Sequence, residues 1–301
     1  NDCRDAVSAV QEIAKPTWEN FVEPMENALE KLGRAWGIAG HLESVVNSPE
    51  LRDAYNSNIA RISNFYTELG QNEALYEGYK KLHKSAAFKK YSQARQTIVE
   101  HALRDFRLSG AELPPEQKER FKQLAERLSE LTNRFSQNLL DATDSYAAYI
   151  RDEKRLAGLP ADNLAAARAA AEADNRQGYK FTLKAPSYIP VMQYVRDRAL
   201  REQMYTAYVT RASEFDRDEW NNGPLIKEIL QLRQEAAQML GFANYGEESL
   251  ATKMAESPEQ VLTFLKDLAH RCRPFVMNDR AAMVTWAFEN LGIRQLEPWD
   301  V

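Results

Sequence analysis

Apolar residues recur at intervals of three and four along much of this chain, which is the spacing of one face of an amphipathic helix. The longest stripe runs from Phe121 to Ile150. Pro115 and Glu116 mark its start, because proline fits a first helical turn and an acid suits the helix dipole. We predict one long continuous helix here. Its predicted core positions are Phe121, Leu124, Leu128, Leu131 and Phe135.

A second stripe, from Phe21 to Val46, predicts another long helix and contains three glycines, Gly33, Gly37 and Gly40. Glycine in a helix interior costs roughly 1 kcal/mol relative to alanine. Close packing of a neighbouring helix against the three glycines is the expected compensation. Contact with a ligand is the alternative.

Further helices are predicted over 51–68, 72–108, 161–173, 188–213, 224–240 and 258–290, with a break or kink near Pro274. Ser48 and Ser257 each precede a proline and are predicted N-caps, and Gln260 is expected to complete a capping box with Ser257. Only residues 179–183 alternate as a strand would. Residues 145–152 either end the long helix or pair with that strand. The predicted fold class is all-α, with long antiparallel helices and one short β-ribbon as an open alternative.

Composition narrows the classes of partner. Hydrophobic residues make up 44% of the chain and charged residues 28%, which is typical of a globular protein. Acidic residues outnumber basic ones by 44 to 39, which argues against a nucleic-acid partner. The densest lysine group is interpreted as a solvated helix face: Lys80, Lys81, Lys84, Lys89 and Lys90.

No apolar run is long enough to predict a membrane span. Two cysteines, Cys3 and Cys272, favour a reducing compartment and thus a cytoplasmic protein.

The residues of this chain do not form a recognisable catalytic motif. A catalytic zinc ordinarily has three protein ligands, often including two histidines one helical turn apart. The four histidines, His41, His83, His101 and His270, show no such pair, and H-E-x-x-H is absent. G-x-S-x-G, the P-loop and G-x-G-x-x-G are absent as well. We therefore predict no catalytic and no metal residue in this chain, and we assign no substrate-binding residue.

Longer segments resemble the thimet oligopeptidase and oligopeptidase A family of zinc metallopeptidases. The resemblance is carried in order by HLESVVNSPELRDAYN (41–56), TELGQNEALY (67–76), ALRDFRLSGAELPPEQKERF (102–121), RLSELTNRFSQNLLDAT (127–143), LAGLP (156–160), FTLKAPSYIPVMQY (181–194), REQMYTAYVTRAS (201–213), LRQEAAQMLGFANYGEESLATKM (232–254) and LEPWD (296–300). Because these runs are long and ordered, the resemblance is far more specific than any single short motif.

The resemblance implies a two-lobed fold whose mostly helical halves face each other across a narrow channel that admits oligopeptides. Residues 1–301 would be the helical N-terminal region. The zinc ligands and the general base of the metalloendopeptidase would follow Val301 in the catalytic C-terminal half. No zinc would then bind this chain, and this chain alone would be inactive. The alternative is a stand-alone, non-catalytic helical module that binds a peptide or a protein.

The resemblance also implies that the last residues of this chain contact the catalytic half. Ile293, Leu296 and Trp299 are large apolar residues that would contact the catalytic half. We expect Trp299 to be mobile or buried by self-association, and the alternative is that it packs back onto its own domain.

Overall fold

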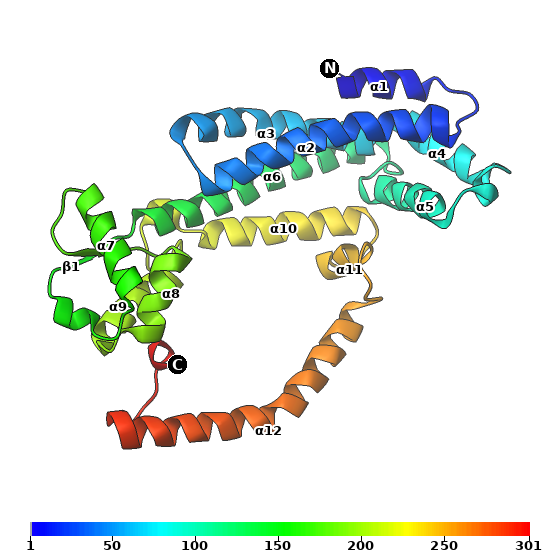
Figure 1. The fold of residues 1–301 in the computed structure, drawn as a ribbon. Helices are drawn as coiled ribbons and strands as arrows, with labels where there is room; N and C mark the ends of the chain where they lie inside the picture. Colours follow the sequence, from blue (N-terminus) through cyan, green and yellow to red (C-terminus); the bar gives the residue numbers. More distant parts are fainter. Residues whose placement is uncertain (1) are drawn as a thin grey trace. The chain divides into compact units, whose positions relative to one another are not determined.

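A computed structural model describes residues 2–301 and divides them into two compact units. The first unit extends to Asn133 and also includes Glu228–Met254. The second unit comprises Arg134–Lys227 and Ala255–Val301. Helices make up most of both units (Figure 1), and the predicted all-α class is confirmed. None of the described helices combines the length and apolar content needed to cross a bilayer.

The first unit is built from α-helices and short helical turns. Its elements are α1 (Asp2–Gln11), a π-helical turn (Trp18–Val22), α2 (Glu23–Val45), α3 (Pro49–Gly70), α4 (Glu73–Lys84), a 3-10 turn (Phe88–Lys90), α5 (Gln93–Leu108), the first part of α6 (Pro115–Ser145), the later part of α10 (Gly223–Met239) and α11 (Tyr245–Leu250). Helices α2 and α3 lie side by side as an antiparallel pair (Figure 1). The unit's core gathers side chains from α1, the π-helical turn, α2, α4 and α5, with Phe21, Leu75, Tyr79 and Leu82 almost completely buried.

The second unit combines helices with a two-stranded ribbon. It contains the end of α6, β1 (Ala148–Ile150), a 3-10 turn (Glu153–Leu156), α7 (Ala161–Ala173), β2 (Tyr179–Phe181), α8 (Ala185–Tyr194), α9 (Arg198–Val209), a 3-10 turn (Asp218–Trp220), the start of α10, α12 (Pro258–Leu291) and a last 3-10 turn (Pro298–Asp300). The strands are antiparallel, and Ala148 pairs with Phe181 and Ile150 with Tyr179. Residues 145–152 thus end the long helix and also supply a strand, so the predicted ribbon is confirmed.

The long helix α6 is continuous, as its apolar stripe predicts, but its buried face is narrower than expected. Leu124 and Leu131, seven residues apart, are 1% and 2% exposed. Phe121, Leu128 and Phe135 are only half-buried, so their prediction as core residues is wrong. Positions seven apart lie almost on one line along a helix, and the neighbouring helices cover little more than that line.

Charged residues of α6 outside that line also bind a neighbour. Arg120 donates through Nε and Nη2 to Glu235 at 2.7 and 2.9 Å, and Arg127 donates in the same way to Glu228 at 2.7 and 3.1 Å. Both glutamates lie on α10. Paired guanidinium–carboxylate bonds fix the orientation of the two groups as well as attracting them. They hold α10 to α6 within the first unit.

Two predicted helices are interrupted by caps. The range 72–108 breaks between Ser85 and Ser92: the Ser85 hydroxyl accepts from the Phe88 amide at 3.2 Å, and Ser92 caps α5. The range 188–213 breaks at Asp197, whose carboxylate accepts from the Leu200 amide at 3.1 Å. Serine and aspartate side chains offer the backbone an alternative to the helical hydrogen bond. These caps explain why one predicted helix becomes two in each case.

The expected packing at the glycines of α2 holds at one position. A Cβ at Gly40 would lie 3.3 Å from the Tyr55 hydroxyl, which packs there. At Gly33 and Gly37 no atom of the described residues beyond the adjacent residues and the local helix backbone comes within 4 Å of that position, so the packing explanation is wrong for both. The capping prediction for α12 also needs a correction. Ser257 caps the Gln260 amide, but the Gln260 side chain accepts from the Glu256 amide at 2.7 Å instead of from Ser257.

Candidate functional site

The four histidines lie on four different helices, α2, α4, α5 and α12, and all four are exposed. His83 packs its ring against Phe88, with ring centroids 4.5 Å apart. Cys272 is exposed on α12. Within residues 2–301, no group of three or more histidine, cysteine, aspartate or glutamate side chains is arranged to hold a metal ion.

Two carboxyl groups are perturbed by burial. Desolvation raises the pKa of Glu26 on α2 and of Glu248 on α11 above their usual values. The Oε2 atom of Glu248 is buried and accepts no hydrogen bond from the described residues. A carboxyl with a raised pKa is a common general acid or base, but catalysis also needs a converging partner. Neither carboxyl belongs to a group that could bind a metal.

The strongest polar cluster in the second unit surrounds Asp300, in the LEPWD segment. Its carboxylate is 1% exposed and accepts from Arg198 at 2.8 to 3.1 Å and from Arg201 at 3.0 Å. The backbone amide of Glu297 donates to it as well, at 3.0 Å. The hydrogen bonds from Arg198 are the main reason that the pKa of Asp300 is lowered.

These bonds fasten the last 3-10 turn to α9. Arg201 also donates to the Trp299 carbonyl at 2.8 Å and to the Val195 carbonyl at 2.8 Å. The Trp299 ring is half-buried against Tyr205 and lies under the Arg198 guanidinium. Trp299 therefore packs onto its own unit, as the alternative proposed, and the prediction of a mobile or self-associated Trp299 is wrong. The signal was Arg198 and Arg201, two arginines one helical turn apart, which sequence reasoning left unassigned.

An apolar pocket of about 420 Å³ adjoins this cluster. It lies between the last turns of α12, the residues that follow them, and Arg201. Its walls are mostly hydrophobic: Met283, Trp286, Leu291, Ile293, Leu296 and Val301. Both charged groups at its edge, Arg201 and Asp300, are already paired with each other. The pocket is thus suited to apolar side chains and not to a polar reaction.

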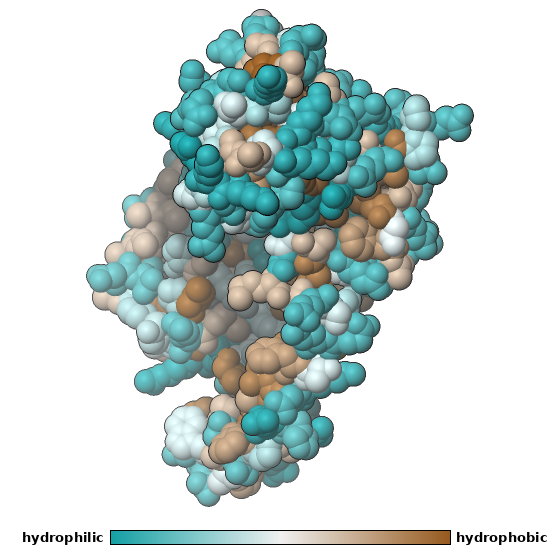
Figure 2. Space-filling model, turned by 90° about the vertical axis from the view of Figure 1, so that its right-hand side faces the viewer, coloured by the Kyte–Doolittle hydropathy of each residue, from teal (hydrophilic) through white to brown (hydrophobic). Residues whose placement is uncertain are grey.

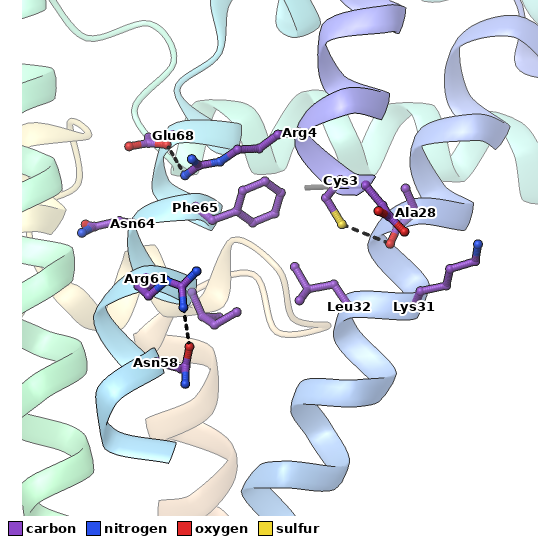
Figure 3. Close-up of a pocket in the computed structure, with 12 residues that line it drawn as sticks. Cys3, Arg4, Ala28, Lys31, Leu32, Asn58, Arg61, Asn64, Phe65 and Glu68 are labelled. Atoms are coloured by element: carbon purple, nitrogen blue, oxygen red, sulfur yellow. Dashed lines mark hydrogen bonds and ion pairs between the residues drawn. The ribbon is translucent and has the colours of Figure 1, made fainter. Parts of the chain in front are cut away.

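A larger pocket of about 650 Å³ lies in the first unit, among α1, α2 and α3 (Figure 3). Most polar groups in its wall bond to one another: Arg4 donates to Glu68, Arg61 to Asn58, and Cys3 to the Ala28 carbonyl. The close-up shows these pairs along the wall, with Lys31 at one side (Figure 3). Its charge is mixed, and the buried Asn64 Oδ1 atom accepts no hydrogen bond from the described residues. The described lining residues form no group that could hold a metal ion.

Comparison with known proteins identifies the family. Residues 1–120 match the family model described as Neurolysin/Thimet oligopeptidase, N-terminal domain, and residues 191–301 match Peptidase family M3. This chain therefore belongs to the thimet oligopeptidase and oligopeptidase A family of peptidases, and it corresponds to the N-terminal part.

Individual relatives locate the chain within this family. It is 48% identical to oligopeptidase A of Salmonella typhimurium over 303 residues, covering 100% of this chain and 45% of that protein. The organellar oligopeptidase A of Arabidopsis thaliana is 38% identical over 97% of this chain and 37% of its own length. Saccharolysin of Saccharomyces cerevisiae is 26% identical over 91% of this chain and 38% of its length. This chain thus spans less than half the length of each of these relatives.

Proposed function

We propose that this chain is the N-terminal channel wall of a cytosolic, zinc-dependent oligopeptidase that hydrolyses short, unstructured peptides. The observation that carries the proposal is the 48% identity to an oligopeptidase A along the whole chain. Because the shared part makes up 45% of that relative, the proposal places the chemistry in polypeptide that follows position 301. The single helical region 1–301 would then be one structural part of a larger enzyme.

The side chains of residues 2–301 do not fit a catalytic zinc. Such a site needs about three nitrogen, oxygen or sulfur ligands on a converging face. The described histidines are exposed on separate helices, and no suitable group of ligands forms. The proposal therefore gives this chain no catalytic step. Its role is to shape the space that a peptide enters, opposite the catalytic half of the same polypeptide.

The test compares two proteins: residues 1–301, and the same residues continued by their own downstream coding sequence. We expect an H-E-x-x-H motif in the continuation, one zinc per longer chain by elemental analysis, and hydrolysis of a quenched fluorescent peptide. Residues 1–301 alone should bind no stoichiometric zinc and cleave nothing. One tightly bound zinc on residues 1–301 would contradict the proposal. A continuation without the motif, or a longer protein that binds peptides without cutting them, would favour the non-catalytic binding module.

A further inference from the structure

Helix α12 exposes an unusual amount of apolar surface. Of its 34 residues only Ala287 is buried. Its exposed large apolar side chains are Leu262, Phe264, Leu265, Leu268, Phe275, Val276, Met277, Met283, Trp286, Phe288 and Leu291. In Figure 2 the lower part of the view shows brown and tan hydrophobic side chains at the surface among teal ones. Soluble proteins seldom leave a continuous patch larger than about 300–600 Å² uncovered, so this surface calls for a partner.

The exposed side chains point to several sides of the helix. Phe275, Val276 and Met277 are consecutive and are 71%, 57% and 53% exposed. With about 3.6 residues per turn, consecutive side chains point about 100° apart. Near the end of the helix, Trp286 and Phe288 are also exposed, at 58% and 55%, and they too point to different sides. Charged residues such as Lys266, Arg271 and Arg280 are also exposed on this helix, so it is not apolar throughout. Its large apolar side chains nevertheless lie on more than one side, whereas an ordinary surface helix confines them to one stripe.

This distribution argues against a second copy of the chain as the partner. A two-fold contact joins one patch to the same patch on the other copy, and so covers one side of a helix. Three consecutive apolar side chains on three sides need a surrounding structure. The pocket lined by Trp286, Leu291 and Leu296 is a further apolar surface on the same helix, and Val301 lies in its wall. Polypeptide leaving Val301 would therefore begin beside the surface that needs to be covered.

One further observation agrees with this occupant. The Peptidase family M3 match includes all of α12 and extends to residue 301, while the relatives are more than twice as long as this chain.

We infer that α12 is an interior helix of the complete enzyme, enclosed by the polypeptide that follows Val301. This inference rests on the proposed function only in assuming that such a continuation exists. The catalytic half would fill the apolar pocket and surround Phe275, Val276 and Met277. Residues 258–291 would then be a shared core element, and the N-terminal region would not be a separable module.

The exposed thiol of Cys272 reports directly on this enclosure. We compare its rate of alkylation, located by mass spectrometry, in residues 1–301 and in the natural longer chain. Cys3, whose thiol donates to the Ala28 carbonyl on α2, is the internal control because both proteins should label it equally. We expect Cys272 to react at least about tenfold more slowly in the longer chain, since labelling would then require local opening.

The outcomes separate the inference from the proposed function. Protection of Cys272 in a longer chain that lacks peptidase activity would support enclosure and refute the activity. An active longer chain with a freely reactive Cys272 would refute enclosure alone. Protection in residues 1–301 that disappears on dilution would identify a second copy as the partner. Protection that persists in monomeric residues 1–301 would show that α12 is covered within this chain. Either of the last two results overturns the inference.

Discussion

Helices α4 and α12 are both rich in apolar residues but distribute them differently. α4 has 12 residues and buries Leu75, Tyr76, Gly78, Tyr79 and Leu82, whereas α12 has 34 residues and buries Ala287. The apolar side chains of α4 share one face, so one packing surface satisfies them. Those of α12 are spread around the helix, and the described residues do not enclose them. The difference shows that one quantity predicts a helix and another predicts its contacts. The number of helix sides that carry large apolar residues indicates how many sides need a packing partner.

The largest effect should come from matched leucine truncations in these two helices. Leu82 on α4 is 0% exposed, and Leu268 on α12 is 47% exposed. Leu82→Ala should lower the free energy of unfolding by about 2–5 kcal/mol, because a buried leucine leaves a cavity. Leu268→Ala in residues 1–301 should change it by less than about 0.5 kcal/mol. Urea unfolding followed by circular dichroism measures both, and equal losses would mean that α12 already has a packed core.

The same two substitutions, Leu82→Ala and Leu268→Ala, also test the contrast between α4 and α12 in the natural longer chain. Enclosure of α12 predicts that Leu268→Ala becomes costly there, within about 2–5 kcal/mol, while the cost of Leu82→Ala stays the same. A Leu268→Ala variant that remains neutral in the longer protein would show that this side of α12 faces solvent in both.

A smaller effect is expected from glycine substitutions that contrast the packed region with an open one. A Cβ at Gly78 on α4 would lie 2.4 Å from the Phe21 ring, which is 1% exposed and cannot move freely. Gly78→Ala should therefore cost about 1–3 kcal/mol through overpacking, reduced by the better helix propensity of alanine. Gly37 on α2 has open space at this position. Gly37→Ala should stabilise the protein by about 0.5–1 kcal/mol.

Thermal melts of the two variants give the sign directly. Opposite signs would confirm that close packing occurs at Gly78 and is absent at Gly37. A destabilising Gly37→Ala substitution would instead show that a partner approaches the glycines of α2, as the original interpretation of this stripe expected.

The elements that sequence predicted well are those fixed by local pattern. The 31 residues of α6, the Ser48 and Ser257 caps, and the β1–β2 ribbon each follow from spacing or from a single capping side chain. The errors involve contacts between distant residues. Leu128 shares the apolar stripe of Leu124 but lies just outside the line that neighbouring helices cover. Trp299 is held by Arg198 and Arg201, about a hundred positions earlier, and the spacing of apolar residues cannot reveal such a pair.

The family resemblance assigned no site residue to this chain, and the cluster around Asp300 was not predicted from the sequence. Residue chemistry pointed to no catalytic group, and the described side chains form no metal-binding group. The functional interpretation therefore comes from ordered segments such as LEPWD and not from any one reactive residue. Asp300, in that segment, has a packing role in the described structure: it joins the last turn to α9.

The smallest effect is expected at the last 3-10 turn, Pro298–Asp300, which is packed against α9, in contrast to the exposed side chains of α12. Arg198 lowers the pKa of Asp300, so ionised Asp300 stabilises the folded turn. That contribution is complete above the pKa of an unfolded aspartate, about 3.9, and disappears as pH falls through the lower folded value. Protonation should release the turn and expose Trp299.

In difference spectra against Trp299→Phe, the Trp299 emission should stay blue-shifted from neutral pH down to about pH 4 and move to the red below it. Asp300→Asn keeps the shape of the side chain but lacks the charge, so its Trp299 emission should be redder at neutral pH and should show no such acid transition. A dilution series establishes that the protein is monomeric throughout. If Trp299 emission is already red-shifted at neutral pH in the unsubstituted monomer, the turn is not held by its arginines and the contrast with α12 fails at this point.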